Sequence, residues 1–299
     1  MNNLKRGFWL VLLASAAWGQ AIRVTLLGTG TPRPMIERFG ASILVQAGKE
    51  NLLFDAGRGC TIRLAQAGVP LKDITKLFLT HLHSDHTVGI PDLWLTGWIF
   101  DRAEPLEVWG PKGTEAMMRG LRQAYAYDIE VRSKFGNSRA GADIRAHDIR
   151  EGVVYEANGV KVTAFLVDHG NVKPAFGYRV DYGGHSVVLS GDTRPSENLV
   201  KHAQGVDVLV HEVYAVTPEE LKKDPKEQNI VAYHSTPEQA GEIFSRTRPK
   251  LAVYSHIVPP DATDLIADTR KTYSGPVEVG EDLMSIEIGD TVAVHRPGH

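Results

Sequence analysis

The chain has 299 residues, of which 42% are apolar and 23% are charged, and its formal net charge is -3. These values lie close to globular averages, which excludes a disordered, collagen-like, coiled-coil or disulfide-rich protein. Because Cys60 is the single cysteine, an internal disulfide and a cysteine-based zinc site are excluded as well. Any metal must therefore be bound by His and carboxylate side chains.

The first nineteen residues have the pattern of a secretory signal peptide. Lys5 and Arg6 precede an apolar run over 7–18, and Ala17 and Gly19 are small residues at the positions that signal peptidase reads. The run is shorter than the roughly twenty residues that a membrane-spanning helix needs. We therefore expect a signal peptide over 1–19, a periplasmic or secreted mature protein, and no stable membrane insertion after cleavage. Cleavage removes two basic residues and no acidic one, so the net charge becomes -5.

Residues 20–299 are expected to form one domain, since no linker, repeat or low-complexity segment divides them. Short apolar, β-branched runs predict strands at 22–27, 41–46, 51–54, 76–80, 106–109, 160–167, 186–189, 207–210 and 251–254. Helical patterns lie at 61–67, 92–99, 114–127, 237–247 and 262–272. Strand pairs followed by alternating strands and helices predict an α+β fold, in which helices cover a layered mixed sheet.

The helix over 237–247 has the clearest predicted start. Thr236 is a capping residue, Pro237 suits the first helical position, and Gln239 completes a capping box. We therefore expect this helix to begin directly after Thr236.

A His-rich loop follows the predicted strand over 76–80. It reads His81-Leu82-His83-Ser84-Asp85-His86. A loop at the end of a buried strand can direct several side chains to one point. Neutral imidazole and carboxylate suit zinc, with manganese and iron as alternatives. The loop therefore predicts a metal site.

Three further apolar runs are each followed by a residue of the same types. His169 follows the run that ends at 167, Asp192 follows the one that ends at 189, and His256 follows the one that ends at 254. Each of these residues alone is more often structural than functional. Together they repeat one pattern, in which a strand presents a metal ligand at its C-terminal end. One loop has too few ligands to bind two metals, and these three residues would provide the rest.

At these residues the chain resembles the metallo-β-lactamase superfamily of binuclear metallohydrolases, and within it the ribonuclease Z-like and arylsulfatase-like branch. The similarity also covers 26–32, Phe54-Asp55-Ala56-Gly57 and Gly89-Ile90-Pro91. The resemblance implies an αβ/βα four-layer sandwich with two Zn²⁺ ions, Mn²⁺ or Fe²⁺ being alternatives. It implies one metal bound by His81, His83 and His169, a second bound by Asp85, His86 and His256, and Asp192 as the bridge between them.

Two short segments resemble the ribonuclease Z-like branch in particular. His211-Glu212-Val213-Tyr214 is similar to its His-Glu-Ala-Thr segment, and His234-Ser235-Thr236 to its His-Ser-Thr segment. The resemblance implies that Glu212 and His234 form a pair that assists proton transfer to the leaving group. The departure at Val213 and Tyr214 retains Glu212 and is expected to narrow the pocket. The alternative is that Glu212 and His234 lie on unrelated surfaces.

Paired cations of this kind support hydrolysis. Two cations roughly 3.5 to 4 Å apart can share a water, lower its pKa and stabilise charge on the substrate. Asp85 would orient the attacking water or accept its proton, and His234 would protonate the leaving oxygen. Phosphodiesters, sulfate esters, lactones and β-lactams all develop negative charge on oxygen, so all suit such a site.

The sequence favours a small-molecule substrate over nucleic acid. Ribonucleases Z carry a long tRNA-binding arm, often between the ligands that resemble His169 and Asp192, but only 22 residues separate these two here. A mature charge of -5 without a basic cluster also lacks the footprint of a nucleic-acid-binding protein. We therefore predict an exported binuclear zinc metallohydrolase that acts on a small phosphodiester, sulfate ester, lactone or β-lactam.

Three questions stay open at this point. The chain could be a true tRNA 3′-processing endoribonuclease, ribonuclease Z, whose leader is misread. It could also be a non-catalytic metal-dependent binding protein. A homodimer is one open arrangement of the subunits.

Overall fold

The computed structural model describes residues 21–216, 218–223, 225–259 and 264–298. The predicted signal peptide over 1–19 lies outside these residues. Within the described part of the chain, no helix combines the length and the apolar character needed to cross a membrane.

The first sheet combines N-terminal strands with two strands from the end of the chain. Within the described residues its order is β15-β14-β1-β2-β3-β4-β5-β6. The strands are β1 (Ile22–Gly28), β2 (Ser42–Ala47), β3 (Glu50–Phe54), β4 (Lys76–Phe78), β5 (Leu106–Gly110), β6 (Ile144–Asp148), β14 (Ser285–Ile288) and β15 (Val292–His295). The neighbouring pairs from β3 to β6 are parallel, and the other pairs are antiparallel.

The second sheet is built from the C-terminal half of the chain. Among the described strands its order is β13-β12-β11-β10-β9-β8-β7. The strands are β7 (Gly152–Ala157), β8 (Val160–His169), β9 (Val172–Tyr182), β10 (His185–Leu189), β11 (Val208–Tyr214), β12 (Leu251–Val258) and β13 (Val277–Val279). The strands β10, β11, β12 and β13 run parallel to one another, so their C-terminal ends lie along one edge of the sheet.

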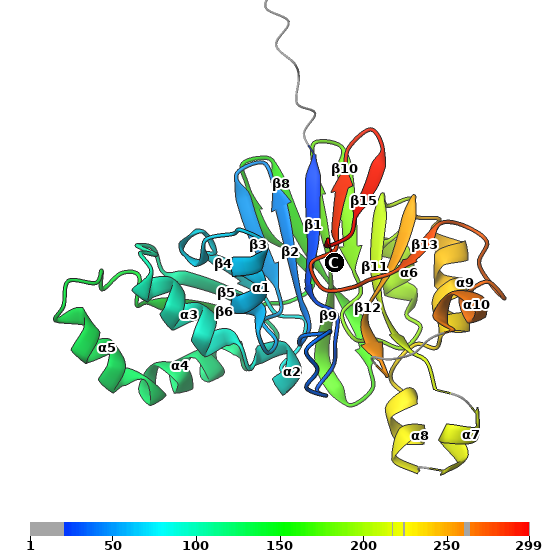
Figure 1. The fold of residues 1–299 in the computed structure, drawn as a ribbon, viewed down its shortest axis with the longest axis horizontal. Coiled ribbons are helices and arrows are strands. Elements are labelled where there is room, and N and C mark those ends of the chain that lie inside the picture. Colours follow the sequence, from blue (N-terminus) through cyan, green and yellow to red (C-terminus); the bar gives the residue numbers. More distant parts are fainter. Residues whose placement is uncertain (1–20, 217, 224, 260–263, 299) are drawn as a thin grey trace, which may run out of the picture.

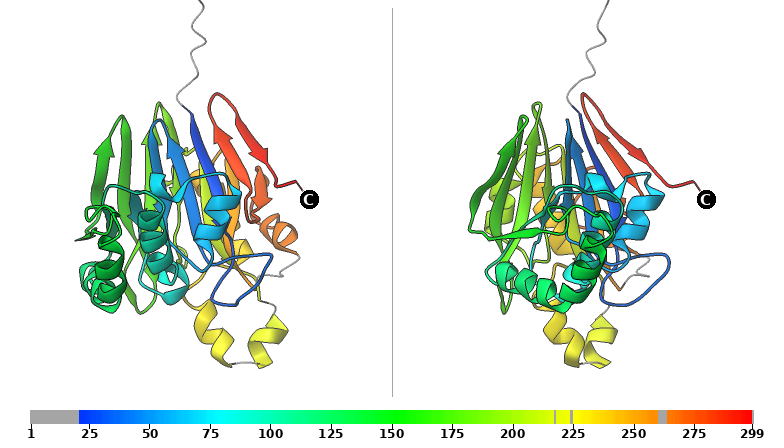
Figure 2. Two further views of the ribbon diagram at one scale, coloured as in Figure 1. Left: turned by 60° about the vertical axis from the view of Figure 1, so that its left-hand side comes forward. Right: turned by 90° about the vertical axis from the view of Figure 1, so that its left-hand side faces the viewer.

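Helices cover the outer faces of both sheets, which pack face to face (Figures 1 and 2). The helices that follow strands of the first sheet are α1 (Cys60–Gln66), η1 (Leu71–Asp73), α2 (Ser84–Thr87), α3 (Ile90–Ile99), α4 (Thr114–Ala124) and α5 (Ala126–Ser133). Those in the second half are α6 (Glu197–His202), α7 (Pro218–Lys223), α8 (Pro225–Val231), α9 (Pro237–Thr247) and α10 (Leu265–Thr269). Figure 1 shows α7 and α8 projecting from the body of the fold.

Three apolar clusters explain the layering. The central cluster contains side chains of both sheets, such as Val24, Leu52 and Val210, and holds the sheets together. A second cluster lies between the first sheet and its helices, and a third lies between the second sheet and α6, α9 and α10. Burial of apolar surface from both faces of each sheet is the main stabilising contribution. The predicted α+β, αβ/βα four-layer sandwich is therefore confirmed.

The structure differs from the local expectations in several places, and among the described strands β6, β7, β9, β13, β14 and β15 were not predicted. The helix predicted over 114–127 is broken at Tyr125, where the backbone leaves helical geometry and α5 begins. The strand β9 contains Pro174 and Gly177, which are depleted in strands, so its sequence did not indicate a strand of 11 residues. In contrast, α9 starts as expected, with both hydrogen bonds of the capping box between Thr236 and Gln239.

Candidate metal centre

The His-rich loop lies where the chain leaves β4 and turns into the short helix α2. Its ligand candidates differ in burial: His81 is fully buried, Asp85 and His86 are buried on α2, and His83 is exposed. The loop therefore presents three buried candidate metal ligands and one, His83, that is accessible from solvent.

The second sheet supplies the remaining candidates from the ends of three strands. His169 is the last residue of β8, Asp192 follows β10, and His256 lies near the end of β12. Gly191, directly before Asp192, has a φ of 61°, and a Cβ there would lie 2.5 Å from the carbonyl oxygen of Phe176. A glycine is thus required for the turn that brings Asp192 into the site.

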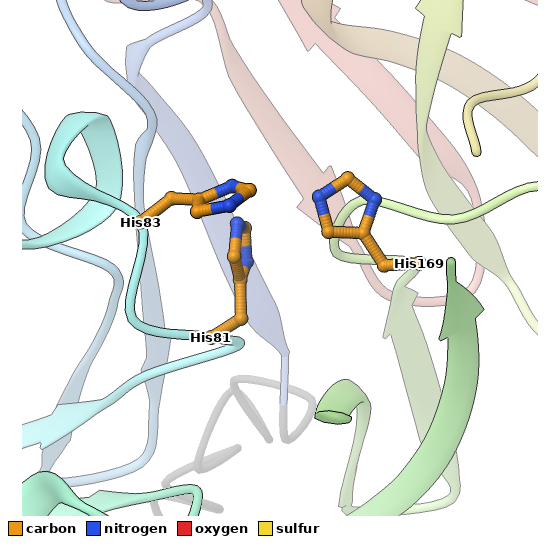
Figure 3. Close-up of side chains that lie close together, drawn as sticks. All are labelled: His81, His83 and His169. Atoms are coloured by element: carbon orange, nitrogen blue, oxygen red, sulfur yellow. The ribbon is translucent and has the colours of Figure 1, made fainter. Parts of the chain in front are cut away.

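All seven predicted ligands meet in one cluster. The structure brings together His81, His83, Asp85, His86, His169, Asp192 and His256. Figure 3 shows His81 and His83 on one loop, with the imidazole of His169 opposite them on another segment. Ligand atoms of His81, His83 and His169 lie within 4.8 Å of one another, and so do those of Asp85, His86 and His256.

Asp192 lies at the centre of this cluster. Its Oδ2 atom is 3.5 Å from the Nε2 atoms of His86 and His256. The same oxygen is 3.9 Å from the Nε2 atoms of His81 and His169. One carboxylate that faces imidazoles from both triplets is suited to contact two cations at once.

Several of the converging atoms lack a hydrogen bond. Within the described residues, Nε2 of His81, His86 and His169 and Oδ1 of Asp192 are buried without a hydrogen-bond partner. Leaving four such atoms unsatisfied would cost roughly 4 to 12 kcal/mol in total, comparable to the 5 to 15 kcal/mol that stabilises a typical protein. A His and carboxylate set of this kind fits divalent cations, whose coordination would satisfy these atoms.

The electrostatics of the cluster also suit metal binding. Burial lowers the pKa of His81 well below its usual value, and burial likewise lowers the pKa of His169. Burial of Asp192 acts in the opposite sense, but the neighbouring His256 and His86 outweigh it and hold the pKa of Asp192 well below its usual value. Neutral imidazoles at His81 and His169 and an ionised carboxylate at Asp192 are the protonation states that metal ligands require. In His86, burial lowers the pKa, but Asp192 and Asp55 outweigh it and raise this pKa well above its usual value.

Outer hydrogen bonds orient the imidazoles. Asp55 at the end of β3 accepts a hydrogen bond of 2.7 Å from His86 Nδ1, and two of 2.8 Å from the backbone N–H and hydroxyl of Thr80. Since that hydroxyl donates to Asp55, it accepts from His81 Nδ1 at 3.0 Å. His169 Nδ1 donates to the carbonyl of Tyr233 at 3.1 Å. Each hydrogen bond places the proton on Nδ1 and leaves the unprotonated Nε2 free to bind a metal.

The orienting role of Asp55 was not predicted. The segment Phe54-Asp55-Ala56-Gly57 was a point of resemblance to the superfamily and carried no predicted role. The signal was the same as for the ligands, a carboxylate directly after an apolar strand. Thr80 and the carbonyl of Tyr233 carry no comparable signal, because a hydroxyl or carbonyl beside a site is visible only in three dimensions.

We expect Asp55→Asn to lower metal affinity by about 10- to 100-fold, the effect typical of an outer carboxylate partner. The amide no longer presents two acceptor oxygens to His86 and Thr80. Competition with a chromophoric chelator measures the affinity. Asp73→Asn, at an exposed position on η1, is the matched control. Equal affinities for the two variants would contradict the orienting role.

The predicted pair of Glu212 and His234 is also assembled at the cluster. A register shift in β11 at Glu212 turns its side chain towards His234, whose Nδ1 lies 3.2 Å from Glu212 Oε2. Backbone N–H groups of Ser235 and Thr193 donate to the other oxygen, at 2.9 and 3.3 Å. A ring nitrogen of His234 lies within 4.8 Å of the ligand atoms of Asp192 and His169. The alternative of two unrelated surfaces is thereby excluded.

Glu212 also changes the protonation of His234. Burial lowers the pKa of this imidazole, but the adjacent carboxylate outweighs burial and raises the pKa of His234 to about 9. Glu212 therefore favours the protonated imidazole of His234, the form that a proton donor requires.

Comparison with known proteins shows the family to which the chain belongs. The beta-lactamase superfamily domain family matches residues 50–257. Ribonuclease Z of Mycobacterium sp. (strain KMS) is 37% identical over 284 residues, which cover 93% of this chain and 100% of the relative. Ribonuclease Z of Mycobacterium avium (strain 104) is 36% identical over 277 residues, with 89% and 98% covered.

Solved structures show the same fold. Human tRNase Z, short form, superposes with a TM-score of 0.66 at 25% identity and covers 89% of this chain and 99% of its own. The metallo-beta-lactamase fold protein YhfI from Bacillus subtilis superposes with a TM-score of 0.70 at 19% identity, with 89% and 99% covered.

The fold and the matching domain place the chain in the metallo-β-lactamase superfamily, as a metal-dependent hydrolase. Within that superfamily it belongs to the ribonuclease Z-like proteins.

The predicted substrate class, a small molecule rather than nucleic acid, was wrong. We predicted a small-molecule substrate and disfavoured nucleic acid, whereas the similar curated proteins are named ribonuclease Z and one similar structure is a tRNase Z. The error came from net charge, which sums the whole surface and does not report the charges near the site.

Proposed function

We propose that the protein is a binuclear zinc endoribonuclease that processes the 3′ ends of tRNA precursors by hydrolysing a phosphodiester bond. The central position of Asp192 Oδ2, within 3.9 Å of four imidazole nitrogens, is the observation that carries the hydrolytic centre. The names of the similar proteins support RNA as the substrate class. The supporting relatives are covered from end to end, or nearly so, by this chain.

In this proposal His81, His83 and His169 would hold one cation, and Asp85, His86 and His256 would hold the other. Asp192, which lies between the two sets, would be the ligand that they share. When bound, the two cations supply Lewis-acid stabilisation of the phosphate oxygens and make water a usable nucleophile at neutral pH.

The protein side chains move the protons. Asp85 accepts a proton from the attacking water as its oxygen forms the new bond to phosphorus. His234, protonated through its contact with Glu212, donates a proton to the leaving oxygen as the phosphorus–oxygen bond breaks. The Glu212 carboxylate then stabilises the position of the imidazole for reprotonation by solvent.

The decisive experiment is incubation of the purified chain with a precursor tRNA that carries a 3′ extension. We expect endonucleolytic removal of the extension, loss of this activity after chelation, and recovery after addition of Zn²⁺. A mature tRNA without extension is the matched control substrate. An intact precursor after incubation with zinc-loaded protein would overturn the proposal.

The predicted export bears on whether the protein can process precursor tRNA. Export of residues 20–299 and processing of precursor tRNA in the cytoplasm exclude each other for one population of molecules. Cell fractionation with mass spectrometry of the N-terminus tests export: tRNA processing requires cytoplasmic protein, whereas cleavage near Gly19 and a wholly exported pool would support the signal peptide.

A further inference from the structure

The ring of Tyr214 packs against the proton-transfer pair although it belongs neither to that pair nor to the ligand set. Tyr214 is the last residue of β11 and is only 1% exposed. Its ring centroid lies 5.5 Å from that of His234, and the ring planes are inclined by 25°. The His234 ring is also nearly parallel to that of His256, at 6.0 Å and 10°. His234 is thus one of three roughly parallel rings.

The backbone ties Tyr214 to the segment that carries His234. The N–H of Tyr214 donates to the carbonyl of Ser235 at 2.8 Å. Two residues earlier on the same strand, Glu212 accepts from the N–H of Ser235 at 2.9 Å. The end of β11 therefore holds the His234-Ser235 segment through its backbone and through two side chains, one charged and one aromatic.

The two side chains restrict different motions of the imidazole. Glu212 makes one hydrogen bond to Nδ1, and a single bond at 3.2 Å leaves the ring free to tilt about it. A buried ring stacked on the imidazole face opposes that tilt, because tilting would separate the stacked surfaces or drive atoms into close contact. The remaining ring nitrogen is then held in one direction.

We propose that Tyr214 is a positioning residue that holds the plane of the His234 imidazole, so that its proton is directed at the leaving oxygen. This inference rests on the proposed function, since it needs His234 as the proton donor. Tyr214 itself touches neither the substrate nor the reacting atoms in this proposal.

The consequence is a dependence on the leaving group. A leaving oxygen with a pKa near 7 departs as an anion without a proton, whereas a more basic one requires proton donation. Loss of the Tyr214 ring should therefore slow reactions with basic leaving groups and spare those with acidic ones. A defect in metal binding or folding would slow both alike.

The experiment uses the zinc-loaded full chain and a series of aryl phosphodiesters of thymidine, from 4-nitrophenyl to 4-methoxyphenyl, alongside precursor tRNA. We expect Tyr214→Leu to lower kcat for the most basic leaving group by about 10-fold, part of the 10²- to 10⁴-fold that general acids contribute. KM and the 4-nitrophenyl rate should stay within about twofold of the parent, because P–O cleavage there needs no acid. Tyr214→Phe, which keeps the ring, should restore the parent behaviour.

A matched control removes a buried ring elsewhere. Phe165 is fully buried and stacks on His202 at 4.6 Å, in the layer of α6. Phe165→Leu should lower Tm in the same way as Tyr214→Leu without changing the leaving-group dependence. Equal losses for all leaving groups in Tyr214→Leu, or no loss at all, would overturn the inference.

A spectroscopic measurement follows His234 without reference to turnover. The stacked Tyr214 ring should shift the ring-proton resonances of His234 upfield, and this shift should vanish in Tyr214→Leu and persist in Tyr214→Phe. An unchanged His234 spectrum in Tyr214→Leu would also overturn the inference. If wild-type protein leaves precursor tRNA intact while hydrolysing the aryl esters, the tRNA assignment fails and the role of Tyr214 is still measured on the aryl series.

Discussion

Asp192→Asn should lower kcat by about 10³-fold or more, the scale expected when several kcal/mol of charge stabilisation by paired cations is lost. Asp192 Oδ2 lies within 3.9 Å of imidazoles from both ligand triplets. Asparagine keeps the size of the side chain but removes its charge, and its amide nitrogen would be turned towards cations or imidazoles. We expect the variant to bind less than the full complement of metal.

Elemental analysis of the purified protein and kcat on precursor tRNA measure the two effects together. Asp181→Asn is the matched control, because Asp181 lies on β9 and pairs with Arg179 at the surface of the second sheet. A variant at 192 with full metal content and parental kcat would refute the bridging position of Asp192.

His234→Ala is expected to lower kcat by about 10²- to 10³-fold, within the range for removal of a general acid. In contrast to Asp192→Asn, it should leave metal content unchanged, because His234 is directed by Glu212 and is not required for either triplet. The loss should be largest for precursor tRNA and small for a 4-nitrophenyl phosphodiester.

The control for this variant is His147→Ala, at an exposed position on β6 where the imidazole contacts Glu107. Its kcat should equal that of the parent protein. If His234→Ala lost metal together with activity, His234 would have to be counted among the ligands, and the proton-donor role would be wrong.

Much of the layered architecture could be predicted from local pattern. Apolar runs such as 22–27 and 251–254 form buried strands, and the capping box at Thr236 starts α9 as expected. These features depend on residues that are neighbours in the chain, so secondary-structure propensity and hydrophobic periodicity predict them. Among the described strands, β6, β7, β9, β13, β14 and β15 were missed. In β9, which contains Pro and Gly, and in the half-exposed, charged edge strand β6, the strand is stabilised by its partners across the sheet rather than by its own sequence.

The site, too, has parts that the local sequence indicated and parts that only the fold brings together. Each ligand was visible as a His or Asp placed after an apolar strand, and the structure brings all seven together. The outer partners were visible only in part: Asp55 has the same strand-end position, whereas Thr80 and the carbonyl of Tyr233 act through contacts across the fold. In the sequence, Tyr214 is a departure from the His-Glu-Ala-Thr segment, whereas its stacking on His234 depends on how β11 ends in the fold.

The amino-acid sequence alone determined the donor types and their positions at strand ends, because the lack of cysteine ligands and the order of apolar runs are properties of the chain itself. The tertiary structure decided which donors meet. Residues as distant as Asp85 and His256 come within 3.2 Å because parallel strands of two sheets end at one edge of the sandwich. It also decided the protonation of His234, since that depends on burial and on a carboxylate 22 positions away in sequence. Net charge, summed over the chain, carried no such spatial information, and this is why it misdirected the choice of substrate.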